Sequence, residues 1–170
     1  MGVESPPNNS ADLSRSLKLL VESFPNDVRD ACCAHGDAMA TVAPASLPRI
    51  AEFLKNEPRL LYDVLIDITA VDYPGREHRF EVVYHFLSLP NSERLRLKAA
   101  VAGEKPALPS LTSLWGNANW LEREVWDMFG IEFEGHPDLR RILLYPEFQG
   151  HPLRKDYPVR KRQPLIGPKN

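Results

Sequence analysis

The spacing of apolar and polar residues divides the first hundred or so positions into helix-like and strand-like runs. Apolar side chains recur every three or four positions over residues 13–24 and again over residues 47–54, as on the buried face of a helix. Pro25 ends the first run, and Ser46 is a candidate N-cap for the second. Alternation of apolar and polar residues, weakest in the first run, then marks four candidate strands: residues 37–43, 63–73, 79–87 and 94–101.

The run at residues 79–87 shows the alternation most clearly. One face of it is strongly apolar and the other is mixed: Phe80, Val82, Tyr84 and Phe86 against Glu81, Val83 and His85. Such a strand has one face against a core and the other against water or a partner. Pro74-Gly75 and Pro90-Asn91 supply turns for two hairpins. The sequence therefore predicts an α+β fold, with a four-stranded mixed or antiparallel sheet and helices packed on one face.

The pattern changes after Gly103. Residues 110–115 indicate a short helix, and Asn119 is a candidate cap for a second helix that ends at Gly130. From residue 136 onward prolines interrupt any regular pattern, yet large apolar residues that a disordered tail seldom carries are present. We therefore predict three regions: a flexible N-terminus at residues 1–10, an α+β core domain at residues 11–135 and an extended, Pro-rich C-terminal arm at residues 136–170.

The predicted helix at residues 119–130 contains the most unusual polar residues. Its apolar residues form one stripe at helical spacing: Leu121, Val125, Met128 and Phe129. Arg123 and Asp127 lie one turn apart on the opposite side, where they can form an ion pair. Glu122 and Glu124 both border apolar surface, where an unpaired carboxylate is costly.

The two glutamates suit structural roles better than catalysis. Residues two positions apart on a helix diverge, so Glu122 and Glu124 cannot share a proton or a substrate. With Asn119 as N-cap, Glu122 occupies the N3 position of a capping box. For Glu124 the structural alternative is an ion pair with an arginine of the C-terminal arm. On that basis we expect Glu124→Gln to weaken assembly or stability more than Arg123→Ala.

Charge is distributed unevenly along the chain, although its net value is only −2. Residues 1–135 hold 13 Lys/Arg and 20 Asp/Glu, whereas residues 136–170 hold 8 and 3. A basic tail on an acidic body fits an acidic protein partner or an anionic surface. Nucleic acid fits poorly, because no aromatic residue is interleaved with the last basic run, Arg160-Lys161-Arg162. No direct membrane span is expected, since no apolar run approaches the roughly 18 residues that a spanning helix needs.

The sequence indicates neither a metal site nor a nucleotide site. The two cysteines, Cys32 and Cys33, are adjacent and too few for an iron–sulfur cluster. His136 and His151 each lie between Gly and Pro, which suits a turn better than a zinc ligand pair. No glycine-rich phosphate loop occurs. Two basic clusters can bind carboxylates: Arg140-Arg141 and Arg154-Lys155-Asp156. These residues indicate an interaction protein with a presented helix and an anchored arm.

Three segments, Asn119–Ile131, Gly135–Leu143 and Gly150–Pro158, together carry a dense motif. In order and spacing they resemble the C subunit of bacterial NADH–quinone oxidoreductase, the 30-kDa subunit family of respiratory complex I. The residues that match the family motif are Glu122, Arg123, Glu124, Asp127, His136, Arg140, Arg141, Arg154, Lys155, Asp156 and Tyr157.

The resemblance implies a non-catalytic scaffold subunit in the peripheral arm of a proton-translocating NADH:quinone oxidoreductase, on the cytoplasmic side of the cell inner membrane. It implies that FMN and Fe–S clusters, which carry electrons from NADH to quinone, belong to partner subunits and that this chain holds no cofactor. The D subunit would be the chief partner, with the B and I subunits nearby, and the motif residues would act in internal pairing and docking. Two alternatives stay open: the homologous subunit of a membrane-bound hydrogenase or other quinone-reducing relative, and, less favoured, a free-standing enzyme.

Overall fold

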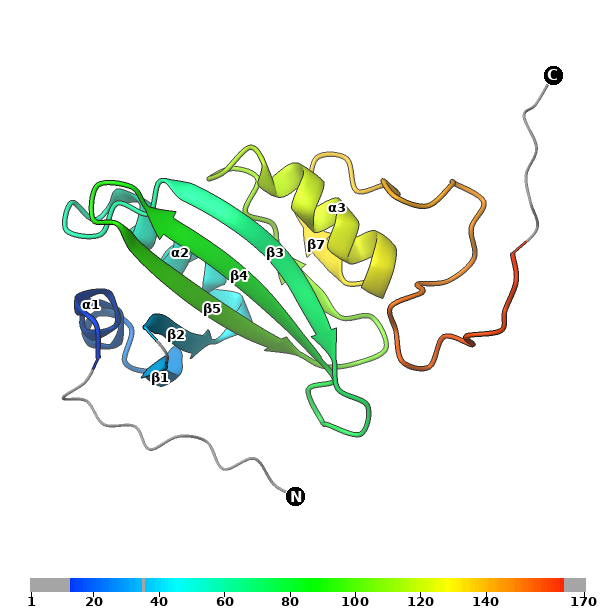
Figure 1. The fold of residues 1–170 in the computed structure, drawn as a ribbon, viewed down its shortest axis with the longest axis horizontal. Helices are drawn as coiled ribbons and strands as arrows, with labels where there is room; N and C mark the ends of the chain where they lie inside the picture. Colours follow the sequence, from blue (N-terminus) through cyan, green and yellow to red (C-terminus); the bar gives the residue numbers. More distant parts are fainter. Residues whose placement is uncertain (1–12, 35, 164–170) are drawn as a thin grey trace.

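Five strands, and not the predicted four, form the main sheet in the part of the chain that the structure describes (Figure 1). The structure is a computed structural model that describes residues 13–34 and 36–163; the predicted flexible N-terminus (1–10) and the end of the predicted arm (164–170) lie outside the described residues. The strands are β1 (Val28–Ala34), β2 (Asp37–Val42), β3 (Val64–Asp72), β4 (Phe80–Ser88) and β5 (Glu93–Val101). Their order is β1-β2-β5-β4-β3, with β2 parallel to β5 and the other neighbours antiparallel, so the sheet is mixed.

The strand that the sequence pattern missed is β1, which pairs with β2 at one edge of the sheet. Its pairing shifts register between Arg29 and Cys32, and Asp30 has a positive φ of 48°. Because the shift breaks the two-residue period, the buried positions fall at Val28 and Ala31 instead of at alternate residues. A strand bulged in this way gives no alternation to detect.

Helices in the described ranges complete the α+β fold, as predicted. They are α1 (Arg15–Ser23), α2 (Leu47–Asn56) and α3 (Ala118–Phe129), with a 3₁₀ helix, η2 (Pro44–Ser46), directly before α2. In Figure 1, α2 lies behind the sheet, α1 lies beside β1 and β2, and α3 lies along the edge strand β3. Ser46 occupies the N-cap position of α2 as predicted, but its hydroxyl makes no capping hydrogen bond and donates to Asp27 at 2.7 Å instead.

One continuous core fills the space between the helices and one face of the sheet. The inward residues of the two central strands are buried: Phe80, Val82, Tyr84 and Phe86 in β4, and Leu95, Leu97 and Ala99 in β5. The opposite face, here called the open face, carries charged and polar residues that are half-buried or exposed: Asp67, Glu81, His85, Arg94, Arg96 and Lys98. The predicted division of the strands into a covered and an open face is therefore confirmed.

A second, two-stranded sheet joins the segment before α3 to the segment after it. β6 (Ala107–Pro109) and β7 (Glu132–Glu134) pair in parallel, and three residues each are too few to produce a sequence signal. The helix predicted at residues 110–115 is wrong, because residues 112–114 form a turn. Contacts with α3, described below, hold this connection in place.

Residues 135–163 contain turns and bends but neither helix nor strand. Figure 1 shows this part of the chain passing the end of α3 after it leaves β7. Residues 136–163 are called the C-terminal segment below. In the part of the chain that the structure describes, no helix has the length and apolar character needed to cross a membrane.

Candidate functional site

Asp127 is the centre of the contacts between α3 and the C-terminal segment. Its carboxylate is fully buried, and Oδ2 accepts hydrogen bonds from the backbone N–H groups of Ile142, Leu143 and Leu144 at 3.1, 2.9 and 2.9 Å. Oδ1 accepts one from Arg141 Nη1 at 2.6 Å. Burial by itself raises the pKa of Asp127, but these donors outweigh it and hold the pKa below its usual range. Three successive backbone N–H groups thus surround one carboxylate, as in an anion-binding nest.

Arg123 binds the same stretch of the segment through its main chain. It donates from Nε to the carbonyl of Arg140 at 3.0 Å and from Nη2 to the carbonyl of Arg141 at 2.9 Å. The predicted ion pair between Arg123 and Asp127 is wrong, because no such pair forms among the described residues and both side chains bind the segment. The helix side opposite the apolar stripe is covered by the segment, and both residues are buried there.

Arg141 also holds the segment to itself. Its Nη2 donates to the carbonyls of Phe148 and Gly150 at 2.8 and 3.0 Å. The guanidinium lies 5.7 and 5.6 Å from the ring centroids of Trp126 and Phe148, within the range of cation–π attraction. Phe148 stacks in turn on Tyr157, with centroids 6.1 Å apart. One arginine therefore connects α3 to two turns of an irregular chain.

The C-terminal end of α3 is closely approached by His151 and Arg154. Gly130 ends the helix with a φ of 70°, and a Cβ added there would lie 2.5 Å from His151 Cδ2. His151 Nδ1 lies 3.0 Å from the Asp127 carbonyl oxygen, so this nitrogen carries the proton. Burial, joined by the nearby arginines, lowers the pKa of His151, which keeps the ring neutral at pH 7. Arg154 Nε donates to the carbonyl of Phe129.

Glu122 points away from the segment and into the body of the protein. It is fully buried, with Oε1 accepting from the Leu111 N–H at 2.7 Å and Oε2 from the Ser110 hydroxyl at 2.6 Å. Burial raises the pKa of Glu122 to about 7 against the opposing effect of these two hydrogen bonds. The capping-box prediction is wrong, because Asn119 already lies inside α3 and Glu122 binds the preceding connection. The buried hydroxyl of Tyr84 has no hydrogen-bond partner among the described residues.

Glu124 is exposed and makes no ion pair within the described residues, so its predicted pairing with an arginine of the arm is wrong. The arginines of the segment bind Asp127, Asp138 and main-chain carbonyls instead. Because Arg123 is the buried residue of the two, we expect Arg123→Ala to cost the fold more stability than Glu124→Gln, whereas the predicted effect of Glu124→Gln on assembly stays a prediction.

The two histidines of the motif lie at opposite ends of α3. His136 Nε2 donates to the carbonyl of Asn119 at 3.1 Å, and its Nδ1 accepts from the Asp138 N–H at 3.0 Å. Asp138 also pairs with Arg140 at 2.8 Å on the surface. No three His, Cys, Asp or Glu side chains of the described ranges come together in a way that could hold a metal ion.

A second anchor of the segment, centred on Asp72, was not predicted. Asp72 is buried at the end of β3 and accepts from Arg79 Nε and Nη2 at 2.7 and 2.8 Å, and from the Lys155 N–H at 2.7 Å. These bonds, chiefly those from Arg79, lower the pKa of Asp72. Arg79 also pairs with Asp156 at 2.9 Å. One feature of the sequence could have indicated this anchor: Asp72 and Arg79 carry opposite charges and lie on either side of the turn of the first hairpin.

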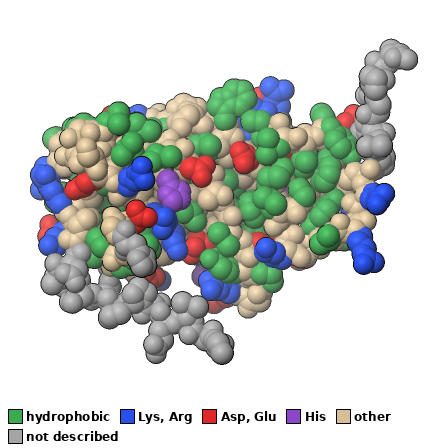
Figure 2. Space-filling view, in the orientation of Figure 1, with side chains coloured by type: hydrophobic (Ala, Val, Ile, Leu, Met, Phe, Trp, Pro, Cys, Tyr) green, Lys and Arg blue, Asp and Glu red, His purple; other side chains and the backbone are tan. Residues whose placement is uncertain are grey.

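Hydrophobic side chains remain exposed around α3 and the segment. Trp120, Leu143 and Leu153 are 60%, 61% and 51% exposed. Figure 2 shows hydrophobic side chains gathered over this part of the molecule, whereas the open face of the sheet mixes charged, polar and hydrophobic groups. Several large apolar residues close together on a surface indicate an interface.

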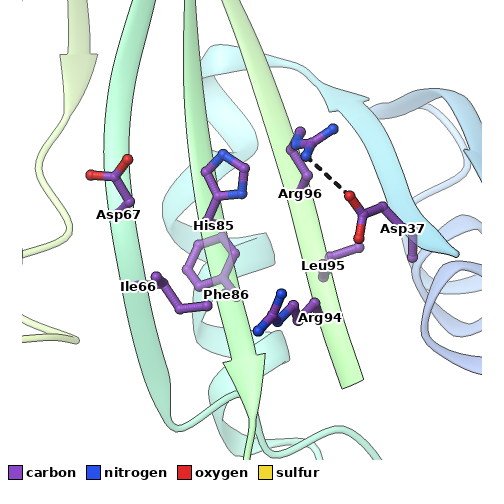
Figure 3. A pocket seen from close by; sticks show the side chains of 9 residues that line it. Asp37, Ile66, Asp67, His85, Phe86, Arg94, Leu95 and Arg96 are labelled. Atoms are coloured by element: carbon purple, nitrogen blue, oxygen red, sulfur yellow. Dashed lines mark hydrogen bonds and ion pairs between the residues drawn. The ribbon is translucent and has the colours of Figure 1, made fainter. Parts of the chain in front are cut away.

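A hollow of about 400 Å³ lies on the open face of the sheet (Figure 3). It is lined by Asp37, Ala38, Ile66, Asp67, His85, Phe86, Arg94, Leu95 and Arg96. Burial, together with the charge of Arg96, lowers the pKa of His85, so this ring is neutral at pH 7. None of the motif residues of α3 or the C-terminal segment lines the hollow.

Several motif residues, among them Arg123, Asp127 and Arg141, thus form hydrogen bonds that hold an irregular segment against a helix, with apolar side chains left exposed beside it. This combination defines an interaction module built on an α+β sheet. A family model described as "Respiratory-chain NADH dehydrogenase, 30 Kd subunit" matches residues 40–163. The chain belongs to that family, the 30-kDa subunit of the respiratory-chain NADH dehydrogenase.

Curated relatives cover nearly the whole chain. The C 2 subunit of NADH-quinone oxidoreductase from Rhizobium meliloti is 45% identical over 152 residues, which are 89% of this chain and 83% of the relative. The C subunit of NADH-quinone oxidoreductase from Citrifermentans bemidjiense is 42% identical over 159 residues, 92% of this chain and 98% of the relative.

Two solved structures share the fold. The trypsin-resistant fragment (1–134) of Nqo5 is 34% identical with a TM-score of 0.59, over 73% of this chain and 99% of the fragment. A chain of the archaeal membrane-bound sulfane sulfur reductase, a respiratory membrane complex, is 25% identical with a TM-score of 0.70, over 84% of each chain.

Proposed function

We propose that this chain is a non-catalytic scaffold subunit of a proton-translocating NADH:quinone oxidoreductase. Electrons would pass from NADH through FMN and Fe–S centres to quinone in partner subunits, and no residue of this chain would take part in the chemistry. The observation that carries this proposal is the use of the motif residues: Asp127, Arg123, Arg141 and Arg154 bind backbone groups of their own chain. Residues engaged in this way position a surface and are not available to a substrate.

The docking surface in this proposal is α3 together with the C-terminal segment, here called the α3 surface. Trp120, Leu143 and Leu153 supply exposed apolar contacts, as interface cores commonly do. The basic run Arg160-Lys161-Arg162 is exposed and supplies charge for an acidic neighbour. The D subunit is the proposed chief partner, with the B and I subunits nearby, on the cytoplasmic side of the inner membrane.

Affinity purification of the full chain from native membranes tests the scaffold role. Flavin- and cluster-bearing, NADH-oxidising subunits should co-purify with it. Leu143→Asp should reduce their recovery by at least about tenfold, since a charge at an apolar interface core costs more than about 1.4 kcal/mol. Val71→Asp, at an exposed apolar residue of the open face, is the matched control and should leave recovery unchanged. Recovery of the chain alone from intact membranes would contradict the proposal.

The likeness to a chain of the membrane-bound sulfane sulfur reductase favours one alternative, a subunit of a related respiratory membrane complex with another electron donor. The same purification separates the two proposals. Co-purification of membrane subunits without any flavin-bearing, NADH-oxidising subunit would favour the alternative.

A further inference from the structure

The hollow on the open face owes its shape to a bulge in β3. Leu65 pairs with Phe86 and Asp67 pairs with His85, so Ile66 is an extra residue without a partner in the register. The bulge leaves Leu65 buried and turns both Ile66 and Asp67 outward, and Ile66 is 44% exposed. Figure 3 shows Ile66 at one side of the hollow and Arg94 at the other.

The two ends of the hollow differ in charge. At one end His85 lies between Asp67 and Arg96 in the register, and Arg96 pairs with Asp37 at 3.2 Å. Asp37 thus compensates Arg96, Asp67 adds one further negative charge, and the neutral His85 ring offers a hydrogen bond instead of a charge.

At the other end the cation of Arg94 has no carboxylate within ion-pair distance among the described residues. Arg94 lies opposite the apolar Leu87 in the register, and the exposed Ile66 lies across the hollow from it. Glu93, its chain neighbour, is engaged elsewhere, because it accepts a hydrogen bond from Ser16. This end is therefore an apolar surface with one uncompensated guanidinium.

We propose that this hollow is a second docking site, which receives an acidic side chain of a partner subunit beside an apolar one. The carboxylate pairs with Arg94, whose planar guanidinium binds carboxylates through two parallel hydrogen bonds. The apolar neighbour packs on Ile66, the exposed apolar residue of the lining. This inference rests on the proposed function, since only a subunit of an assembly has such a neighbour. It adds a contact on the sheet face that the α3 surface does not include.

The arrangement of charges in the hollow favours a polypeptide that carries both acidic groups and hydrogen-bond donors over a polyanion. A nucleic acid or an anionic lipid surface would bring further negative charge next to Asp37 and Asp67 at the far end. A protein segment can place one carboxylate at Arg94 and a hydrogen-bond donor at Asp67.

Site-specific photo-crosslinking in the assembled complex tests this docking site. A benzoylphenylalanine residue is introduced at position 66, at position 143 as a reference for the α3 surface, and at position 71 as the matched control on β3 outside the hollow. Position 66 should form an adduct with a partner subunit next to an Asp or Glu residue, and position 71 should not. Arg94→Glu should reduce the adduct from position 66 by at least about tenfold, as loss of a desolvated ion pair predicts. Arg29→Glu, an exposed arginine of β1, should leave it unchanged.

The outcomes separate this inference from the proposed function. Adducts with a partner from position 143 but not from position 66 would overturn the second site and leave the scaffold role standing. Adducts from position 66 only with residues 1–12 of the same chain, with a second copy or with lipid would overturn it as well. Absence of adducts from both positions in isolated membranes would contradict the scaffold role itself.

Discussion

Replacing Glu122 by glutamine should remove a pH dependence from the stability of the folded chain. Glu122 is fully buried and no cation among the described residues pairs with it, so its charged form is held only by Ser110 and Leu111. Glutamine has nearly the same shape and keeps both contacts, because its carbonyl accepts from the Leu111 N–H and its amide donates to the Ser110 hydroxyl. The substitution therefore removes the charge and little else.

The size of the effect follows from the pKa. Folding raises the pKa of Glu122 from 4.5 to about 7. At about 1.36 kcal/mol per pKa unit, the ionised carboxylate costs the fold about 3 kcal/mol relative to the protonated one. The pKa of Glu122 is higher in the folded state than in the unfolded state. The protonated carboxyl therefore contributes its full stability to the fold below pH 4.5, and this contribution is lost as the pH rises through about 7.

Urea denaturation of the full chain, followed by tryptophan fluorescence between about pH 4 and pH 8.5, measures the difference between the variant and the parent. The difference should be small at the acidic end and should reach up to about 3 kcal/mol in favour of Glu122→Gln above pH 7.5. Glu124→Gln, an exposed change on the same helix, should show no such trend. A difference for Glu122→Gln that stays constant across the whole pH range would refute the reasoning, because Glu122 would then not titrate in this range.

Three further substitutions test the anchoring of the segment. Asp127→Ala should lower the free energy of unfolding by about 3–5 kcal/mol, because it removes the carboxylate that pairs with the largely buried Arg141 and leaves three N–H groups without their acceptor; faster trypsin cleavage after residues 140 and 141 checks release of the segment. Gly130→Ala should cost at least about 1–3 kcal/mol through the positive φ and should also displace His151, which loss of protection in hydrogen exchange would reveal. Arg123→Ala should cost about 1–3 kcal/mol in urea denaturation by leaving two carbonyls unpaired, against about 0–0.5 for Glu124→Gln. The opposite order would mean that Glu124 has a partner that the described residues do not include.

The sheet could be read from the sequence because its central strands obey a local rule. β5 alternates along most of its length and β4 does so except at the buried Val83, so the inward and outward residues of β4, from Phe80 to Phe86, were assigned correctly from a window of a few positions. β1 was not predicted for the converse reason, because the register shift after Arg29 destroys the two-residue alternation on which a strand assignment depends.

The partners of the polar motif could not be read in this way. Asp127 and Arg123 were paired with each other because helical spacing permits it. Their true partners lie 14 to 18 residues further on, in a segment without any period. Glu122 likewise fits the pattern of a capping box, but tertiary burial places it against Ser110. Local spacing showed which residues were unusual and gave no indication of what they bind.

The nest around Asp127 has a consequence for how the chain is completed during synthesis. Its three N–H donors and Arg141 follow Asp127 by 14 to 17 positions and belong to a segment with no regular structure of its own. A chain that stops between α3 and residue 141 contains Asp127 but none of these four donors. The contacts that hold the C-terminal segment against α3 at Asp127 can therefore form completely only after residue 144 has been added.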